Sequence, residues 1–430
     1  MNDVLVIGAG LSGLVAAWQA VENGRSVRVV AKGWGITHWH AGCIDVLGYY
    51  PLDNPEPVVA LETAVSRLAT EHPQHPYALI RLDNLQTAIE AFKALCATAN
   101  YPLHGSLTRN WLLPSALGTF RPTCLAPATM IAGDLTDNTP MLIVGFSRWL
   151  DFAPALVADN LTHQGIQATH VTLDLPSLRQ RKIVTALTIA NLMETPAFRA
   201  ELVNALKPYL SKAGRIGFPA VLGYTQATAV HQTLQKELGR PVFEIPTLPP
   251  SIPGMRLHHI LLHTIRQKGG MVLEGLEATA ATTQNGRITG LYTSAATRHR
   301  LHHAHHFILA TGGILGGGIT TNYTGEITET IFNLPLSTPV NRQSWFRRDF
   351  LDPQGHPIYQ TGVRVNQQLQ PLNENGQPIY ENLQAIGTIL ANWEPIRERS
   401  LEGVALATGF IAGRGKTVTS HKTQTTSTSN

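Results

Sequence analysis

The chain has 430 residues, of which 43% are hydrophobic and 14% charged, with a formal net charge of +4 and a pI near 9.0. This length suits two or three domains around a large buried core, and the basic residues are too scattered for a nucleic-acid partner. No stretch approaches the length of about 18 apolar residues that a membrane span needs, so we expect neither a signal peptide nor a transmembrane segment.

The first predicted elements are a buried strand over Val4–Ile7, a helix over Leu11–Asn23 that Gly24 ends, and a second strand over Val27–Val30. Between the first strand and the helix stand Gly8, Gly10 and Gly13, with the spacing GxGxxG. In this setting Gly8 permits a tight turn, Gly10 lets the backbone approach a pyrophosphate, and Gly13 lets the helix pack on the strand. The pattern predicts a dinucleotide whose phosphates rest on the N-terminus of the helix.

The end of the second strand departs from this pattern. An acid about 20 residues after the turn would bind the adenosine ribose, but the sequence there is Ala31-Lys32. Lys32 either donates to a phosphate or ribose oxygen or is a solvated loop lysine. The ligand is therefore an FAD held atypically at its adenosine end or a mononucleotide flavin, and the motif alone favours FAD.

Residues 70–250 form a second α/β region. "MLIVGFSRWLDFAPALVADNL" predicts a strand, a turn and a helix, "RIGFPAV" and "PVFEIP" predict strands, and "ATAVHQTLQKELG" predicts a helix that Gly239 ends. The turn at Gly145–Arg148 lacks the glycine spacing of another nucleotide site. We predict an inserted cap or substrate domain over 70–250, a flavin domain assembled from 1–69 and 251–415, and a disordered polar tail over 416–430.

Two later segments favour a flavin over a nicotinamide cofactor. A strand over Phe307–Leu309 ends in Ala310-Thr311-Gly312, a turn at which backbone can approach a flavin closely. A further strand leads to Gly387, and a helix follows from about Leu401 to Ala412 with Ser400 as its N-cap. The positive end of that helix would stabilise a reduced, anionic flavin. The fold class predicted is α/β, a Rossmann-like FAD/NAD(P)-binding domain with an inserted α/β cap domain.

Four segments, "AGCIDVLG", "LGTFRPT", "IPTLPPSIPGMRL" and "NLQAIGTIL", resemble the B subunit of the anaerobic glycerol-3-phosphate dehydrogenase, within the fumarate-reductase-like flavoproteins. The resemblance implies a flavin subunit, usually assigned FMN, of a complex that oxidises sn-glycerol 3-phosphate to dihydroxyacetone phosphate and passes electrons to quinone. It implies two partners, a larger FAD subunit and an iron–sulfur subunit that docks on the membrane. The chain would then be cytoplasmic and peripheral at the inner face of the membrane.

The resemblance also suggests cofactor-binding residues and one departure. Besides the three glycines and Lys32, the expected cofactor residues are Thr37, Gly42, Ala310, Thr311, Gly312, Gly387 and Thr388. The family carries a glycine-rich turn where this chain reads Arg397–Gly403, with long charged side chains. If a flavin ring lies against this turn, Arg397 or Arg399 must swing away or stack on it, and a stacked cation would stabilise the reduced flavin.

Oxidation of a secondary alcohol needs a base for the hydroxyl proton, and a phosphorylated substrate needs cations. Candidate phosphate ligands are Arg121, Arg256 and Arg364, and candidate bases are His258 and His259. Each could instead be a surface ion pair or a helix-face histidine. Strand alternation would place His302 and His306 on one face, and His259 and His263 are four residues apart, but no Cys or carboxylate lies nearby, so no metal site is predicted.

Three interpretations of the function are open. The chain is a redox enzyme subunit, a non-catalytic electron-relay or scaffold subunit, or a stand-alone reductase of the fumarate-reductase type. It has only three cysteines, Cys43, Cys96 and Cys124, without a CxxC pair. Because an iron–sulfur cluster needs about four thiolates, we expect this chain to hold none by itself.

Overall fold

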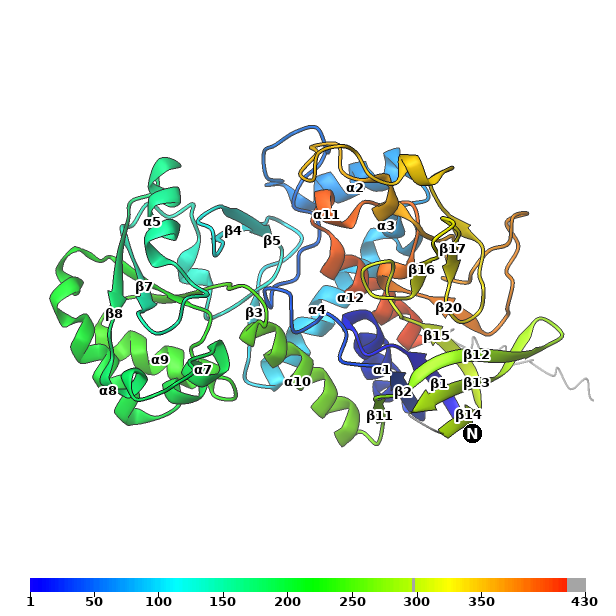
Figure 1. Ribbon diagram of the computed structural model, residues 1–430, viewed down its shortest axis with the longest axis horizontal. Helices are drawn as coiled ribbons and strands as arrows, with labels where there is room; N and C mark the ends of the chain where they lie inside the picture. The colour runs from blue at the N-terminus through cyan, green and yellow to red at the C-terminus, as the bar shows by residue number, and fades with distance from the viewer. Residues whose placement is uncertain (296–297, 416–430) are drawn as a thin grey trace, which may run out of the picture.

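The computed structural model describes residues 1–295 and 298–415, and the predicted disordered tail lies outside them. Two α/β bodies lie side by side (Figure 1). The first contains a five-stranded parallel sheet in the order β11-β2-β1-β15-β20. Its strands are β1 (Asn2–Ile7), β2 (Val27–Ala31), β11 (Met271–Glu274), β15 (Ala304–Leu309) and β20 (Leu383–Ala385). Segments from both ends of the chain thus build one sheet.

Helices α1 (Leu11–Glu22) and α12 (Leu401–Arg414) pack against each other beside this sheet, with α10 (Ile252–Gln267) on the side of the second body. Nearly all of α1 is buried because it is covered by the sheet, α12 and α10 together. The ring of Trp18 on α1 lies 6.3 Å from that of Phe410 on α12, between ring centroids. The helices expected at Leu11 and Leu401 are therefore confirmed, and both are core elements.

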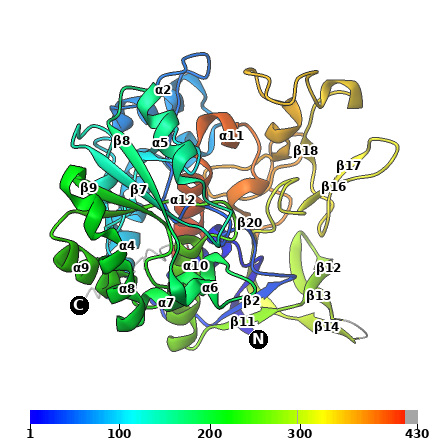
Figure 2. The ribbon, with the colours of Figure 1, turned by 60° about the vertical axis from the view of Figure 1, so that its left-hand side comes forward.

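The second body contains a parallel sheet in the order β10-β9-β7-β8, which helices surround (Figure 2). Every residue of β7, β9 and β10 is buried, which is typical of parallel strands covered on both faces. The expected strands and the helix that Gly239 ends are all present. The elements are β7 (Met141–Phe146), α5 (Pro154–His163), β8 (Ala168–Leu173), α6 (Pro176–Arg179), α7 (Ala186–Met193), α8 (Pro196–Leu206), β9 (Arg215–Pro219), α9 (Ala227–Leu238) and β10 (Val242–Ile245).

Helices α2 (Leu61–Glu71), α3 (Pro76–Ile80) and α4 (Leu82–Thr98) belong to the core of the first body. Buried side chains such as Phe92 join that core, and the Phe92 ring lies 6.4 Å from the Trp18 ring. In sequence order, the first side chain that packs against the core of the second body is that of Leu112, which is partly buried. We therefore propose that the inserted region begins near β4 (Trp111–Pro114) and not at residue 70.

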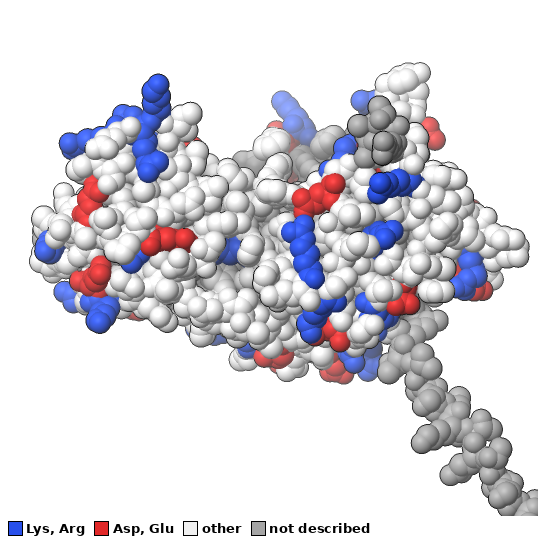
Figure 3. All heavy atoms as spheres, turned by 90° about the horizontal axis from the view of Figure 1, so that it is seen from below, with Lys and Arg blue, Asp and Glu red and all other residues white. Residues whose placement is uncertain are grey.

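Short antiparallel sheets and helical turns complete the two bodies. They are β3 (Leu103–His104) with β6 (Ala126–Pro127), β4 with β5 (Phe120–Thr123), β12 (Glu277–Gln284) with β13 (Arg287–Ala295) and β14 (Arg298–His302), β16 (Ile319–Thr321) with β17 (Ile327–Glu329), β18 (Leu336–Ser337) with β19 (Gly362–Val363), α11 (Pro395–Glu398), and 3-10 turns at Ile131–Gly133, Lys207–Lys212, Arg342–Ser344, Pro357–Gln360 and Gly387–Ile389. On the face drawn in Figure 3, cationic and anionic side chains are interspersed, and neither sign covers a whole body.

Candidate functional site

A cavity of about 490 Å³ opens where β1, β2 and β15 end. The strands are parallel and Ile7 pairs with both Val30 and Leu309, so the turns that follow these strands meet at one edge of the sheet. Ligands bind at this edge in open α/β sheets. The expected cofactor residues that line the cavity are Gly8, Gly10, Lys32, Thr37, Ala310, Thr311, Gly312 and Thr388.

The three glycines of the first turn have distinct positions. Gly8 has a φ of +113°, and a Cβ atom on it would lie 2.2 Å from the carbonyl oxygen of Ala310. A Cβ on Gly13 would lie 2.1 Å from the carbonyl oxygen of Gly8, whereas one on Gly10 would meet no atom of the described chain within 4 Å. Gly8 and Gly13 therefore permit close backbone packing, and Gly10 leaves room in the cavity at the N-terminus of α1.

An acidic residue from a distant strand lies at the end of β2, where the sequence pattern has no acid of its own. Glu277, the first residue of β12, lines the cavity beside Ala31 and Lys32. The backbone holds it there, because the Leu276 N–H donates to the Ala31 carbonyl oxygen at 3.0 Å. Lys32 Nζ lies 2.8 Å from Glu277 Oε1, and both side chains are more than half exposed. Lys32 thus forms a surface ion pair, and the sequence pattern missed Glu277 because it lies 245 positions away.

Three buried polar atoms belong to residues of the cavity wall and have no hydrogen-bond partner within the described part of the chain: Thr37 Oγ1, His40 Nε2 and Thr311 Oγ1. A buried polar group without a partner costs about 1–3 kcal/mol, so these three atoms are available to hydrogen-bond a ligand in the cavity. Thr388 Oγ1 differs, because it accepts a hydrogen bond from the Gly313 N–H at 3.2 Å. The wall therefore suits a ligand rich in hydrogen-bonding atoms, as a flavin nucleotide is.

Gly42 and Gly387 support the wall without lining it. Gly42 has a φ of +77°, and a Cβ on it would lie 2.2 Å from Cβ of Pro253, at the start of α10. Gly387 has a φ of +71°, and a Cβ there would lie 2.5 Å from Ser12 Oγ on α1. Both glycines were expected to bind the cofactor, but neither lines the cavity. We propose that each is needed for close packing behind the cavity wall.

The N-terminus of α12 faces the cavity through Leu401 and Ala405. Ser400 occupies the N-cap position, but its hydroxyl donates to Glu398 Oε2 at 2.7 Å and does not cap the helix. Arg397 donates to the carbonyl oxygens of Leu52, at 2.8 Å, and Gln354, at 3.2 Å. Neither Arg397 nor Arg399 lines the cavity. Of the two expected arrangements, swinging away from the flavin or stacking on it, the contacts of Arg397 favour the first.

Arg121 is paired with a buried acid. Its Nη2 lies 2.5 Å from Asp45 Oδ2, and both side chains are largely buried. Glu402, in the first turn of α12, lies in the same buried region, where burial and the Asp45 carboxylate raise its pKa to about 8. Arg121 does not line the cavity, so this arginine balances a buried acidic cluster.

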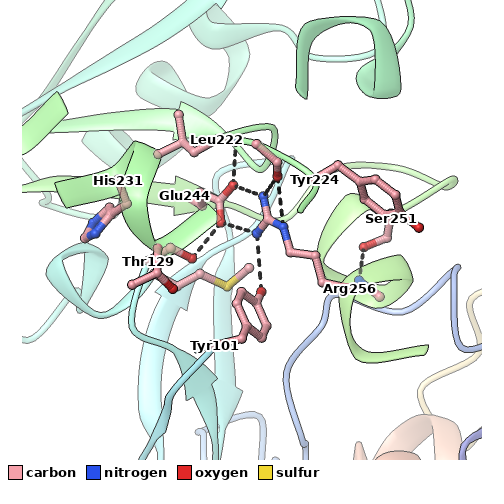
Figure 4. Close-up of polar contacts among 12 residues, drawn as sticks. Tyr101, Thr129, Leu222, Tyr224, His231, Glu244, Ser251 and Arg256 are labelled. Carbon is pink, nitrogen blue, oxygen red and sulfur yellow. Dashed lines mark hydrogen bonds and ion pairs between the residues drawn. The ribbon is translucent and has the colours of Figure 1, made fainter. Parts of the chain in front are cut away.

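Arg256 has no donor left for a phosphate. Its five N–H groups donate to Gly223 O, to Tyr101 Oη and to both carboxylate oxygens of Glu244 (Figure 4). Only 3% of its side chain is exposed, and Glu244 also accepts from Thr129 Oγ1. This network joins α10 to β10, so Arg256 is structural and its expected phosphate-binding role is wrong.

The other expected catalytic residues are dispersed, and none of them lines the cavity. His258 lies against the Trp34 ring, with 5.8 Å between ring centroids, and burial lowers its pKa. His259 stacks on His263, with 6.0 Å between centroids. Arg364 donates to the Asn373 carbonyl oxygen at 3.3 Å. Arg256 and His259 line a separate cavity of about 990 Å³, so the structure does not bring the expected bases and arginines to the cavity at the strand ends.

The two histidine pairs considered as metal ligands lie in different settings. His302 lies on β14 and His306 on β15, so the chain turns between them and the expected common face is wrong. His302 Nε2 bonds to Thr293 Oγ1 at 2.8 Å, and His306 Nε2 bonds to Gln384 Oε1 at 2.8 Å. Over residues 1–295 and 298–415 no three His, Cys, Asp or Glu side chains are grouped to hold a metal ion. Over the same ranges, no helix has the length and apolarity that crossing a bilayer requires.

The glycine turn, the converging strand ends and the positive end of α12 define a dinucleotide-binding flavoprotein. The FAD binding domain family model matches residues 3–400, so the chain belongs to that family. It is 32% identical over 419 residues to the B subunit of the anaerobic glycerol-3-phosphate dehydrogenase of Yersinia pestis, covering 95% of this chain and 97% of the relative. The probable B subunit of the same enzyme in Halobacterium salinarum is 32% identical over 424 residues, covering 96% and 97%. The chain is therefore a member of the B-subunit family of anaerobic glycerol-3-phosphate dehydrogenases.

The chain is also similar to solved structures, at low sequence identity. The chain is similar to 3-ketosteroid delta1-dehydrogenase from Sterolibacterium denitrificans, with 12% identity, a TM-score of 0.42 and coverage of 96% and 98%. It is also similar to a flavocytochrome c3 fumarate reductase, with 9% identity, a TM-score of 0.45 and coverage of 96% and 77%. The relatives confirm the family resemblance expected from the sequence, and the parallel sheets of the two bodies confirm the expected α/β fold class. The expected FMN finds no support in a family whose model describes FAD binding.

Proposed function

We propose that this chain is the flavin-binding subunit of a complex that oxidises sn-glycerol 3-phosphate to dihydroxyacetone phosphate and delivers the electrons to quinone. The observation that carries the proposal is the cavity at the ends of β1, β2 and β15, with its glycine turn and three unpartnered polar atoms. Membership in the B-subunit family supports the substrate.

FAD fits the cavity better than FMN. Glu277 lies beside Lys32 at the end of β2, where a dinucleotide presents its adenosine ribose, and its carboxylate can accept from the ribose hydroxyls. FMN has no adenosine and leaves this carboxylate unused. Replacing Glu277 with glutamine is therefore expected to weaken FAD binding several-fold and to leave FMN binding unchanged. Titration of apoprotein with each flavin measures both affinities, and equal losses for the two flavins would exclude this role.

When bound, the flavin would accept the hydride from the carbinol carbon of the substrate. Residues of this chain at three places in the cavity would then contact the cofactor. The N–H groups at the start of α1 would hold the pyrophosphate, and the Thr37 and Thr311 hydroxyls would supply donors on the wall. The N-terminus of α12, where Leu401 and Ala405 line the cavity, would supply positive potential to a bound flavin.

Partners take the electrons onward. The three cysteines of this chain are all buried and unpaired by disulfides, and burial raises the pKa of the Cys43 thiol to about 12. An iron–sulfur cluster needs about four thiolates and this chain has three cysteines, so we propose that one-electron transfer to quinone uses a cysteine-rich subunit. We propose a larger FAD subunit and an iron–sulfur subunit as partners, and attachment to the inner face of the membrane through the latter.

A second function, a non-catalytic electron-relay role, is favoured by one specific observation. The expected bases and phosphate ligands, including Arg256, His258 and His259, do not line the flavin cavity. Anaerobic addition of glycerol 3-phosphate to the isolated, flavin-loaded subunit separates the two functions. Bleaching of the flavin absorbance supports the dehydrogenase, and an oxidised spectrum that reduces only in the presence of partner subunits supports the relay.

Substitution of Gly10 tests flavin binding itself. A Cβ at Gly10 meets no described atom within 4 Å, and the backbone there (φ −72°, ψ 178°) accepts any residue. Gly10→Val should therefore fold normally and lose flavin, because the branched side chain fills the pyrophosphate position. Gly10→Ala, with one methyl group, should lose less. Absorbance, mass spectrometry of the released cofactor and thermal unfolding are measured together, and full occupancy in Gly10→Val would exclude the site.

A further inference from the structure

His40, in the loop between β2 and α2, has one ring nitrogen engaged and one without a partner. Its Nδ1 accepts a hydrogen bond from the Gly42 N–H at 3.0 Å. Gly42 is packed against Pro253 of α10 in a left-handed conformation, so this N–H is held in place. His40 lines the cavity, and so does Thr37 of the same loop.

The hydrogen bond at Nδ1 determines the tautomer. A neutral imidazole carries one proton, and because Nδ1 accepts, that proton is on Nε2. Nε2 is buried and finds no acceptor among residues 1–295 and 298–415. A buried N–H group without an acceptor is disfavoured, so the ring presents an unused donor at the cavity wall.

The surroundings keep the ring neutral. The charged and titratable groups that act on it are Arg121, from the second body, and His38, from its own loop, and both disfavour a second proton. Asp45, the nearby acid, is engaged by Arg121. Burial and these two groups lower the pKa of His40 to about 3. His40 therefore serves as a hydrogen-bond donor at neutral pH and is not available as a cationic acid.

We propose that His40 binds the flavin by donating its Nε2–H to an acceptor atom of the cofactor. The assignment rests on the proposed function, because it needs a flavin in this cavity. It favours the flavin over the substrate because the wall around His40 is continuous with the Gly8–Gly10 turn and includes the two other unpartnered donors, Thr37 and Thr311. Flavin rings and pyrophosphates are rich in acceptor oxygens and nitrogens.

Histidine nitrogen NMR tests the proposal directly. Protein labelled with ¹⁵N in its histidine rings is compared without flavin, with FAD, and with glycerol 3-phosphate alone, and His40 is assigned from the spectrum of His40→Gln. We expect His40 in the Nε2–H tautomer from pH 5.5 to 8.5 and a shift of its Nε2 resonance when FAD binds. An Nδ1–H tautomer, a resonance that FAD leaves unmoved, or a shift caused only by glycerol 3-phosphate overturns the proposal.

Flavin affinity supplies the second measurement. His40→Leu removes the donor and should raise the Kd for FAD about tenfold, and His40→Gln, whose amide can donate, should recover part of the loss. His38→Leu is the matched control, since His38 lies on the same loop but does not line the cavity, and its Kd should equal that of the wild type. Unchanged affinity in His40→Leu overturns the proposal. Failure of the wild-type protein to bind any flavin would instead refute the proposed function.

Discussion

Replacing Arg256 with methionine is expected to destabilise the protein strongly. The guanidinium makes five hydrogen bonds in a buried network, two of them to the Glu244 carboxylate at 2.7 and 2.9 Å. Removing one partner of a buried ion pair costs about 3–5 kcal/mol, because the other charge remains buried. For a domain of this size that loss corresponds to a fall in Tm of roughly 10 °C.

The pH dependence of the loss identifies its cause. Burial alone would raise the pKa of Glu244, but Arg256 and the hydrogen bonds from Thr129 and Leu222 lower it on balance. The paired carboxylate thus stabilises the wild type above its ordinary pKa, and this contribution is lost as the pH falls through the lowered value. Without Arg256, burial dominates and the pKa of Glu244 rises, so the variant loses stability as the pH increases. The difference in Tm should therefore be larger at pH 8 than at pH 5.

Differential scanning fluorimetry at both pH values, at one protein concentration and without added flavin, measures the difference. Arg67→Met is the matched control, because Arg67 forms an exposed pair with Glu71 and should change Tm by less than about 2 °C. In Glu244→Leu/Arg256→Met no charge is left unpaired, so most of the lost stability should return. A single variant with unchanged Tm and a raised KM for glycerol 3-phosphate would refute the structural role and restore Arg256 as a substrate ligand.

Two further predictions concern α12 and the turn before it. Burial and the charge of Asp45 raise the pKa of Glu402 to about 8, so this group stabilises the folded state below about pH 4.5 and loses that contribution as the pH rises to 8. Glu402→Gln should consequently raise Tm at pH 8 and leave it unchanged at pH 4. A lower Tm of the variant at pH 8 would mean that the folded protein stabilises the charged Glu402 carboxylate. The double variant Arg397→Gln/Arg399→Gln should leave the flavin midpoint potential unchanged, because Arg397 bonds to the Leu52 and Gln354 carbonyls. A spectroelectrochemical fall of about 30 mV, equivalent to about 1.4 kcal/mol for two electrons, would show that one of these side chains lies beside the flavin.

Sequence pattern alone predicted the elements whose cause is local. The glycines at positions 8, 10 and 13 follow a buried strand and begin a helix, and Gly13 is required locally because a Cβ there would meet the Gly8 carbonyl oxygen. Gly8, in contrast, is also required by the distant Ala310 carbonyl oxygen, which the local pattern does not record. Gly239 ends α9 in the left-handed conformation, at a φ of 61°, for an equally local reason. Short-range periodicity and turn chemistry also identified β7, β9, β10 and α12, because each depends on residues within a few positions of one another.

Tertiary structure decided which side chains meet. Glu277 lies beside Lys32 because β12 follows β11, and β11 pairs with β2. Arg256 on α10 forms its ion pair with Glu244 on β10. Helices α3 and α4 join the first core because they pack against α12, and α2 joins it by packing against α3. Gly42 packs against Pro253 of α10, and its N–H donates to His40 Nδ1, which leaves the His40 proton on Nε2. Lys32 and Glu277 are 245 positions apart and Glu244 and Arg256 are 12 apart, but both pairs arise from packing between separate elements. Periodicity records that a face is buried without recording what buries it.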